Sequence, residues 1–110
     1  MSEISVPNLY QLIAAALFAV GVYGVLGRRN LLIMLMSVEL MLNGANLSLV
    51  GFSREAAATP GGAESGQALV LMAMAVAAAE VAVGLSILIA IFRHIRTVDV
   101  DAARATALRG

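Results

Sequence analysis

The sequence predicts an all-α membrane protein with three transmembrane helices, and three observations support this prediction. Of the 110 residues, 61% are hydrophobic and only 13% are charged. A soluble domain of this size needs a larger polar surface over its small core. The charges are concentrated between three long apolar stretches. Each stretch exceeds the roughly 20 residues that an α-helix needs to cross a bilayer.

We expect residues 1–110 to form a single membrane domain. The predicted helices cover about 9–27, 31–53 and 67–92, followed by a polar tail over 93–110. Only the sequence GRRN separates the first two helices, so they must be antiparallel neighbours. The second connection, SREAAATPGGAESGQ, is rich in glycine and typical of a solvated loop. We expect the helices to form a bundle within a larger assembly, and the sequence leaves open whether the tail folds.

The distribution of arginine predicts the orientation of the chain. All seven basic residues are arginine, and only Arg54 is not in the first connection or the tail. By the positive-inside rule, the first connection and the C-terminus face the cytoplasm, and the N-terminus faces the periplasm. The segment before the first apolar stretch contains Glu3 and no basic residue. We therefore expect this stretch to remain as a helix rather than to be removed as a signal peptide.

The composition excludes several classes of function. The formal net charge is zero, so there is no sign of a surface that binds nucleic acid. Cysteine is absent, which excludes disulfides, thiolate-bound clusters and cysteine nucleophiles. The single histidine, His94, cannot form a metal site alone. We expect no metal site in this chain.

Glu39 and Glu80 are isolated acidic residues within the predicted second and third helices. A charge at the bilayer centre costs from about 2.5 to above 10 kcal/mol, depending on the method. Protonation lowers this cost, and a carboxyl group that changes its protonation state within the bilayer can carry protons. At 1.5 Å per residue, Glu39 is expected about 12 Å and Glu80 about 18 Å from the cytoplasmic end. The two carboxyl groups would then lie at different depths, with water bridging them.

Two asparagines accompany Glu39 along the second helix. Asn43 and Asn46 follow it at i+4 and i+7, so the three residues lie on one helix face. We expect this polar stripe to face protein or water rather than acyl chains. No Lys or Arg lies within a predicted helix, so a cationic partner would come from another subunit. The structural alternative is that Glu39 and Glu80 are protonated and only form hydrogen bonds between helices.

Small polar and apolar residues in the predicted helices have simpler explanations. Ser37 and Ser48 are expected to bond to their own backbone. The glycines and alanines are expected to let helix backbones approach closely.

Two segments carry a resemblance to a known family. The sequence resembles the K subunits of proton-pumping NADH–quinone oxidoreductase, respiratory complex I. The resemblance rests on GRRNLLIMLMSVELMLNGANLSLV and on QALVLMAMAVAAAEVAVGLSILIAIFR. The first segment combines a double arginine, Asn30 and the glutamate–asparagine face, and the second is an alanine-rich run that ends on a glutamate. The resemblance extends from the first helix to the start of the tail, and it implies a three-helix membrane protein.

The resemblance also implies site residues. Glu39 and Glu80 would correspond to the two membrane carboxylates that link the quinone-side cavity to the antiporter-like subunits, and they would transfer protons. Arg28 and Arg29 would lie in the cytoplasmic turn on which the family relies. The asparagines that follow Glu39 would support it.

The resemblance further implies partners and a location. The chain would be a non-redox subunit without an active site of its own, and the flavin and iron–sulfur clusters would lie in other subunits. Its partners would be the other membrane subunits of complex I, including antiporter-like subunits, and the lipid bilayer. The quinone would be used by the complex and not bound mainly by this chain. The protein would be a multi-pass component of the bacterial inner membrane.

Other functions remain open at this point. A small three-helix subunit of a multisubunit sodium/proton antiporter or of a membrane-bound hydrogenase-type complex has a similar layout. The two glutamates and the RRN turn favour complex I. A small multidrug exporter has a similar length, but it needs four spans with the acid in the first. A purely structural subunit would keep its activity after Glu39→Gln and Glu80→Gln.

Overall fold

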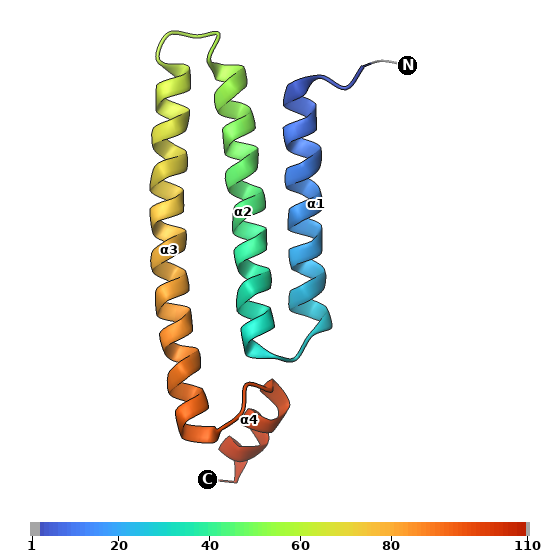
Figure 1. Cartoon of the computed structure of the whole chain (residues 1–110), viewed down its shortest axis with the longest axis vertical. Coiled ribbons are helices and arrows are strands. Elements are labelled where there is room, and N and C mark those ends of the chain that lie inside the picture. Colours follow the sequence, from blue (N-terminus) through green and yellow to red (C-terminus); the bar gives the residue numbers. More distant parts are fainter. Residues whose placement is uncertain (1–2, 110) are drawn as a thin grey trace.

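The computed structural model describes residues 3–109, which contain four α-helices (Figure 1). They are α1 (Val6–Gly27), α2 (Leu31–Ala56), α3 (Gly62–Ile95) and α4 (Val100–Leu108). The first three are long and apolar enough to cross a membrane. This confirms the predicted all-α fold with three spanning helices. Residues 1, 2 and 110 of the predicted domain lie outside the described residues.

The helices start at residues suited to that position. Asn30 precedes α2, and its side-chain oxygen accepts hydrogen bonds from the amides of Leu32 and Ile33 at 2.9 and 3.3 Å. Such caps satisfy amides that have no partner within the helix. Gly61 precedes α3 with φ of 76°, a conformation that glycine adopts at little cost. The ends of α2 and α3 extend past their apolar parts into charged residues, as expected for helices that continue into the headgroup region.

The three long helices form an open row and not a closed bundle. The chain measures 60 × 33 × 15 Å, and α2 lies between α1 and α3 (Figure 1). The buried hydrophobic residues among those described are Ala14, 5% exposed, and Val70, 9% exposed. A closed bundle would bury an inner face on every helix, whereas each of these helices keeps many large apolar side chains exposed. Such surfaces suit lipid or neighbouring membrane subunits.

Glycine allows α1 and α2 to pack closely. A Cβ atom at Gly44 would lie 2.8 Å from the carbonyl oxygen of Ala14 and 3.1 Å from the amide nitrogen of Phe18. A Cβ atom at Gly21 would lie 2.7 Å from the carbonyl oxygen of Ser37. Both distances are shorter than ordinary van der Waals contact. The predicted packing role of small residues is therefore confirmed at this interface.

The chain turns back after α3 and ends in α4. Arg96 has φ of 63° and ψ of 24°, and its amide donates to the carbonyl oxygen of Phe92 at 2.7 Å. A left-handed residue of this kind commonly ends a helix. The following α4 lies beside the α1–α2 turn, at the end of the molecule opposite the N-terminus and the α2–α3 loop (Figure 1). Six of the seven arginines thus gather at one end, as the sequence predicts.

Candidate functional site

Glu39 and Glu80 lie at the same level of two neighbouring antiparallel helices. The register of α2 and α3 follows from two contacts. A Cβ atom at Gly84 would lie 2.9 Å from Leu35, and one at Gly66 would lie 3.0 Å from the Cα atom of Ser53. Glu39 comes four residues after Leu35, and Glu80 comes four residues before Gly84. The prediction that the two acids lie at different depths was therefore wrong.

The error came from the choice of the helix end as a reference. In this register Leu31, the first residue of α2, is level with Leu88 of α3. Phe92 lies four residues further along α3, which is about 6 Å at 1.5 Å per residue. That offset equals the difference between the two expected depths. It arises because α3 continues past the start of α2 as far as Ile95.

The two carboxyl groups differ in their surroundings. Glu39 is half-buried, and Glu80 is exposed on the surface of the isolated chain. Within residues 3–109, no hydrogen bond or ion pair joins either side chain to another residue. Bringing an ionised or hydrogen-bonding group into lipid without a partner is costly. Within a membrane, these side chains therefore need hydrogen-bond partners from water or from a neighbouring protein.

Asn46 and Glu80 both line a groove between α2 and α3, and the register places them about 10 Å apart along the helices. The groove has a volume of about 370 Å³, and the other residues along it are apolar. A water molecule occupies about 30 Å³ and needs polar partners, and each of these side chains can provide one. Glu39 and Asn43 do not line this groove. The groove can thus hold water beside Glu80, at the level of Glu39.

The predicted polar stripe on α2 is only partly covered within the chain. Glu39 and Asn46 are half-buried, and Asn43 is exposed. Their spacing of four and three residues keeps them on adjoining parts of one helix surface. A stripe of this kind in a spanning helix needs cover from protein or water, and the chain alone supplies little of it.

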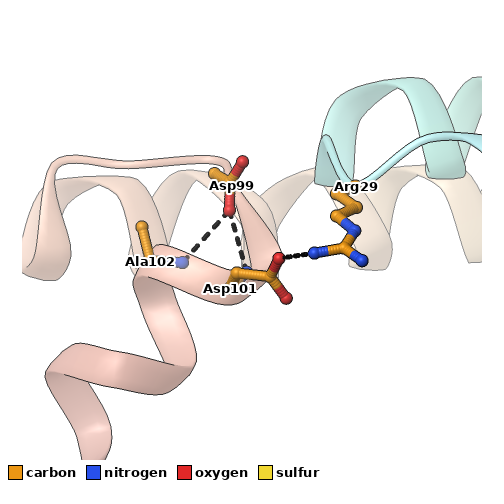
Figure 2. Close-up of polar contacts among 4 residues, drawn as sticks. All are labelled: Arg29, Asp99, Asp101 and Ala102. Carbon is orange, nitrogen blue, oxygen red and sulfur yellow. Dashed lines mark hydrogen bonds and ion pairs between the residues drawn. The ribbon is translucent and has the colours of Figure 1, made fainter.

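The two arginines of the α1–α2 turn have different surroundings. Arg29 forms an ion pair with Asp101 of α4, and Figure 2 shows its guanidinium group pointing at that carboxylate. Arg28 is exposed, and no hydrogen bond or ion pair links its side chain to another residue of the described range 3–109. From the sequence, Arg28 and Arg29 were both predicted to be supporting residues, without a distinction between them.

One polar contact between α1 and α2 was not predicted. The hydroxyl group of Ser48 donates to Gln11 Oε1 at 2.6 Å, and Gln11 Nε2 donates to the carbonyl oxygen of Ser48 at 3.2 Å. The prediction that Ser48 bonds to its own backbone was therefore wrong. The same prediction for Ser37 is confirmed, because its hydroxyl group donates to the carbonyl oxygen of Ile33 at 2.7 Å. An amide side chain within an apolar helix was the signal that could have indicated Gln11.

Across residues 3–109, no three His, Asp or Glu side chains are close enough together to hold a metal ion. The polar groups of the site are carboxyl, amide and guanidinium groups. Carboxyl groups can gain and lose protons, and amide groups can orient water.

Comparison with known proteins identifies the family. The family model for NADH-ubiquinone/plastoquinone oxidoreductase chain 4L matches residues 9–107. This chain belongs to that family. The match includes all of α2 and α3, and therefore Glu39 and Glu80. The resemblance stated from the sequence is confirmed, and the match continues past the start of the tail through most of α4.

Three relatives illustrate how similar known proteins are to this chain. NADH-quinone oxidoreductase subunit K of Salinibacter ruber is 56% identical over 94 residues, which cover 86% of this chain and 88% of the relative. NADH-quinone oxidoreductase subunit 11 of Thermus thermophilus is 55% identical over 92 residues, covering 84% and 90%. The subunit K of Roseiflexus castenholzii is 52% identical over 103 residues, covering 94% and 96%. These names favour the oxidoreductase over the antiporter and exporter alternatives.

Proposed function

We propose that this chain is the K-type membrane subunit of an NADH-quinone oxidoreductase, respiratory complex I, and that Glu39 and Glu80 transfer protons coupled to quinone reduction. The observation that carries this proposal is the shared level of the two acids on neighbouring helices. Two carboxyl groups placed in this way can exchange a proton across the helix row through one or a few water molecules. Carboxyl groups in a membrane interior are typical of proton relays.

The groove beside Glu80 supports a wet route. A proton passes between groups that are within hydrogen-bond reach or joined by a water molecule. Asn46 lines the same groove about 10 Å from Glu80 and can orient water further along it, because its amide group both donates and accepts hydrogen bonds. Arg28 and Arg29 then act at the membrane surface, and the proton path runs between the helices.

The open row supports a role within a larger membrane assembly. Glu80 and Asn43 are exposed on spanning helices, where contact with acyl chains is unfavourable. We infer that other membrane subunits of the complex, including antiporter-like subunits, cover these faces. In this proposal the flavin, the iron–sulfur clusters and most of the quinone site belong to other subunits. This chain has no active site of its own and lies in the bacterial inner membrane, with its arginine-rich end in the cytoplasm.

Direction would come from redox chemistry elsewhere in the complex. A change in nearby charge or hydration alters the free energy of protonating a carboxyl group. If quinone reduction alternately favours protonation of one glutamate and then of the other, a proton moves each time. The two acids then act as stations on one route.

Glutamine substitutions in the intact complex test the proposal. Glu39→Gln keeps the shape of the side chain and removes its titrating group. We expect normal assembly on native gels and about a tenfold or larger loss of proton pumping and coupled quinone reduction, because acid–base groups commonly contribute at least that much. Glu39→Asp should retain part of the activity, since its carboxyl group remains at a shorter reach.

Ser86→Ala provides a matched control on α3. Its hydroxyl group donates to the carbonyl oxygen of Ala82, within its own helix. We expect this variant to pump normally. Normal pumping by Glu39→Gln in an assembled complex would contradict the proposal and favour a purely structural role.

A further inference from the structure

The part of the predicted tail that follows α3, residues 96–109 and called the tail from here on, is joined to the α1–α2 turn by backbone hydrogen bonds. Asn30 and Asp99 form an isolated antiparallel bridge. The amide of Leu31 donates to the carbonyl oxygen of Val98 at 2.8 Å, and the amide of Val100 donates to that of Arg29 at 2.9 Å. Two such bonds in opposite directions set the position of both segments.

The tail also completes the start of α2. Four amides at the start of a helix lack partners within it. In α2, the amides of Leu32 and Ile33 donate to the side chain of Asn30, and that of Met34 donates to its carbonyl oxygen. The Met34 bond is the first bond of the helix itself, whereas the amide of Leu31 donates to the tail. The tail therefore satisfies one amide at the start of the helix that carries Glu39.

Asp99 has a similar role for α4. Its side chain accepts hydrogen bonds from the amides of Asp101 and Ala102 at 2.8 and 3.1 Å (Figure 2). The capping residues of α2 and α4 are thus paired with each other in the bridge. This arrangement starts α4 beside the turn and directs Asp101 toward Arg29.

We infer that the tail is a fixed clasp on the α1–α2 turn, in which Asp101 positions Arg29 and leaves Arg28 as the free cation of the turn. The Arg29–Asp101 pair is exposed, with side chains 76% and 59% accessible. Exposed ion pairs contribute little stability on their own. The backbone bridge therefore carries most of the clasp, and the ion pair selects which arginine is held. This inference goes beyond the proposed proton transfer and does not depend on it.

A disulfide tests whether the clasp is fixed. This chain has no cysteine. Asn30 and Asp99 form an antiparallel pair that is not itself hydrogen-bonded, and the Cα atoms of such pairs are about 4.5 Å apart, which suits a disulfide. In the intact complex, Asn30→Cys with Asp99→Cys should cross-link readily on mild oxidation. Asn30→Cys with Ala107→Cys is the matched control and should not, because Ala107 lies about 12 Å further along the tail.

Activity before and after oxidation gives the decisive comparison. A fixed clasp predicts the same quinone reduction rate in the oxidised and reduced forms of the Asn30→Cys, Asp99→Cys complex, with oxidised wild-type complex as the reference. Absence of the cross-link would overturn the clasp. Cross-linking that stops turnover would show that the tail must move, and would overturn its fixed character. Neither outcome bears on proton transfer by the glutamates.

Charge exchange tests the assignment of the two arginines. Arg29→Asp places two carboxylates together, and we expect cross-linking of the cysteine pair to slow by about threefold or more. Adding Asp101→Arg should restore the rate. Arg28→Asp should leave the rate within about twofold of the unaltered pair, and Asp101→Arg should not compensate for it. Equal effects of Arg28→Asp and Arg29→Asp would refute the assignment.

Discussion

Glu39 on α2 and Glu80 on α3 are level with each other, but no hydrogen bond joins their carboxyl groups. Glu39 is half-buried and Glu80 is exposed beside a groove between the two helices. If the two glutamates exchange a proton as proposed, equal depth lets it cross between the helices without travelling along the membrane normal. The lack of direct contact means that water or a neighbouring subunit must complete the connection.

This arrangement predicts that the two glutamates are not independent. If both are stations on one route, blocking either station blocks the route. We expect the Glu39→Gln, Glu80→Gln double variant to pump at about the rate of the slower single variant. Two independent parallel routes would instead give losses that add, so the double variant would pump more slowly than either single variant. Proton uptake by vesicles containing the three variant complexes, normalised to subunit content, distinguishes these results.

Close backbone packing predicts a loss of stability for Gly44→Ala. The added Cβ would meet backbone atoms of Ala14 and Phe18, which cannot move without shifting α1. Overpacking of this kind costs about 1–3 kcal/mol, which exceeds the roughly 1 kcal/mol that alanine gains over glycine in a helix. We expect the purified complex to lose this subunit at a lower temperature.

Gly27→Ala is the control for that prediction. A Cβ atom there would lie 3.8 Å from the ring of Tyr23, which is an ordinary contact. We expect no fall in the temperature of subunit loss. If Gly27→Ala and Gly44→Ala behaved alike, the close contact between α1 and α2 would not be the cause.

The Gln11–Ser48 contact predicts that substitutions of its two residues lower the stability by different amounts. Ser48→Ala removes the donor to Gln11 Oε1 and leaves that oxygen unpaired between the helices. After Gln11→Leu, the Ser48 hydroxyl group can still donate to the carbonyl oxygen of Gly44, one turn earlier in its own helix. Because an unpaired polar group costs more than a lost pair, we expect Ser48→Ala to be the more destabilising.

Measured hydrogen-bond energies between membrane helices limit the loss of stability that these variants should show. Hydrogen bonds between membrane helices average about 0.6 kcal/mol and reach about 1.7 kcal/mol. The thermal stability of complexes with each single variant and with the double variant would measure the coupling. A larger loss for Gln11→Leu than for Ser48→Ala would contradict the prediction.

The spanning helices could be predicted from the sequence because their signal is local. About 20 consecutive apolar residues are enough to indicate a membrane helix. The two acids were also evident, since each is the single charge within its apolar stretch. The cap at Asn30 and the turn that leads to it likewise depend on neighbouring residues. These features need no knowledge of which helices touch.

The register and the tail could not be predicted because they depend on contacts between distant residues. The level of Glu80 relative to Glu39 depends on how far α3 continues past the start of α2, and charged residues at Arg93 and His94 do not end that helix. Gln11 and Ser48 are 37 residues apart, and Arg29 and Asp101 are 72 apart. An aspartate before an alanine-rich run can indicate a helix start, but nothing in the tail alone indicates where that helix docks.

The unequal arginine content of the two ends of the helix row predicts which side of the membrane each loop faces. Thr59 lies in the exposed α2–α3 loop, and Thr106 lies on the exposed α4 at the arginine-rich end. Because this chain has no cysteine, Thr59→Cys and Thr106→Cys each introduce a single label site. By the positive-inside rule, a membrane-impermeant thiol reagent added to intact spheroplasts should label Thr59→Cys and spare Thr106→Cys. In inside-out vesicles the pattern should reverse, and permeabilised membranes should label both.

Labelling of Thr106→Cys in intact spheroplasts would place the turn that holds Arg28 and Arg29 in the periplasm, and the tail with it. The arginine count would then have failed to predict orientation, although the relation between Glu39 and Glu80 would be unaffected.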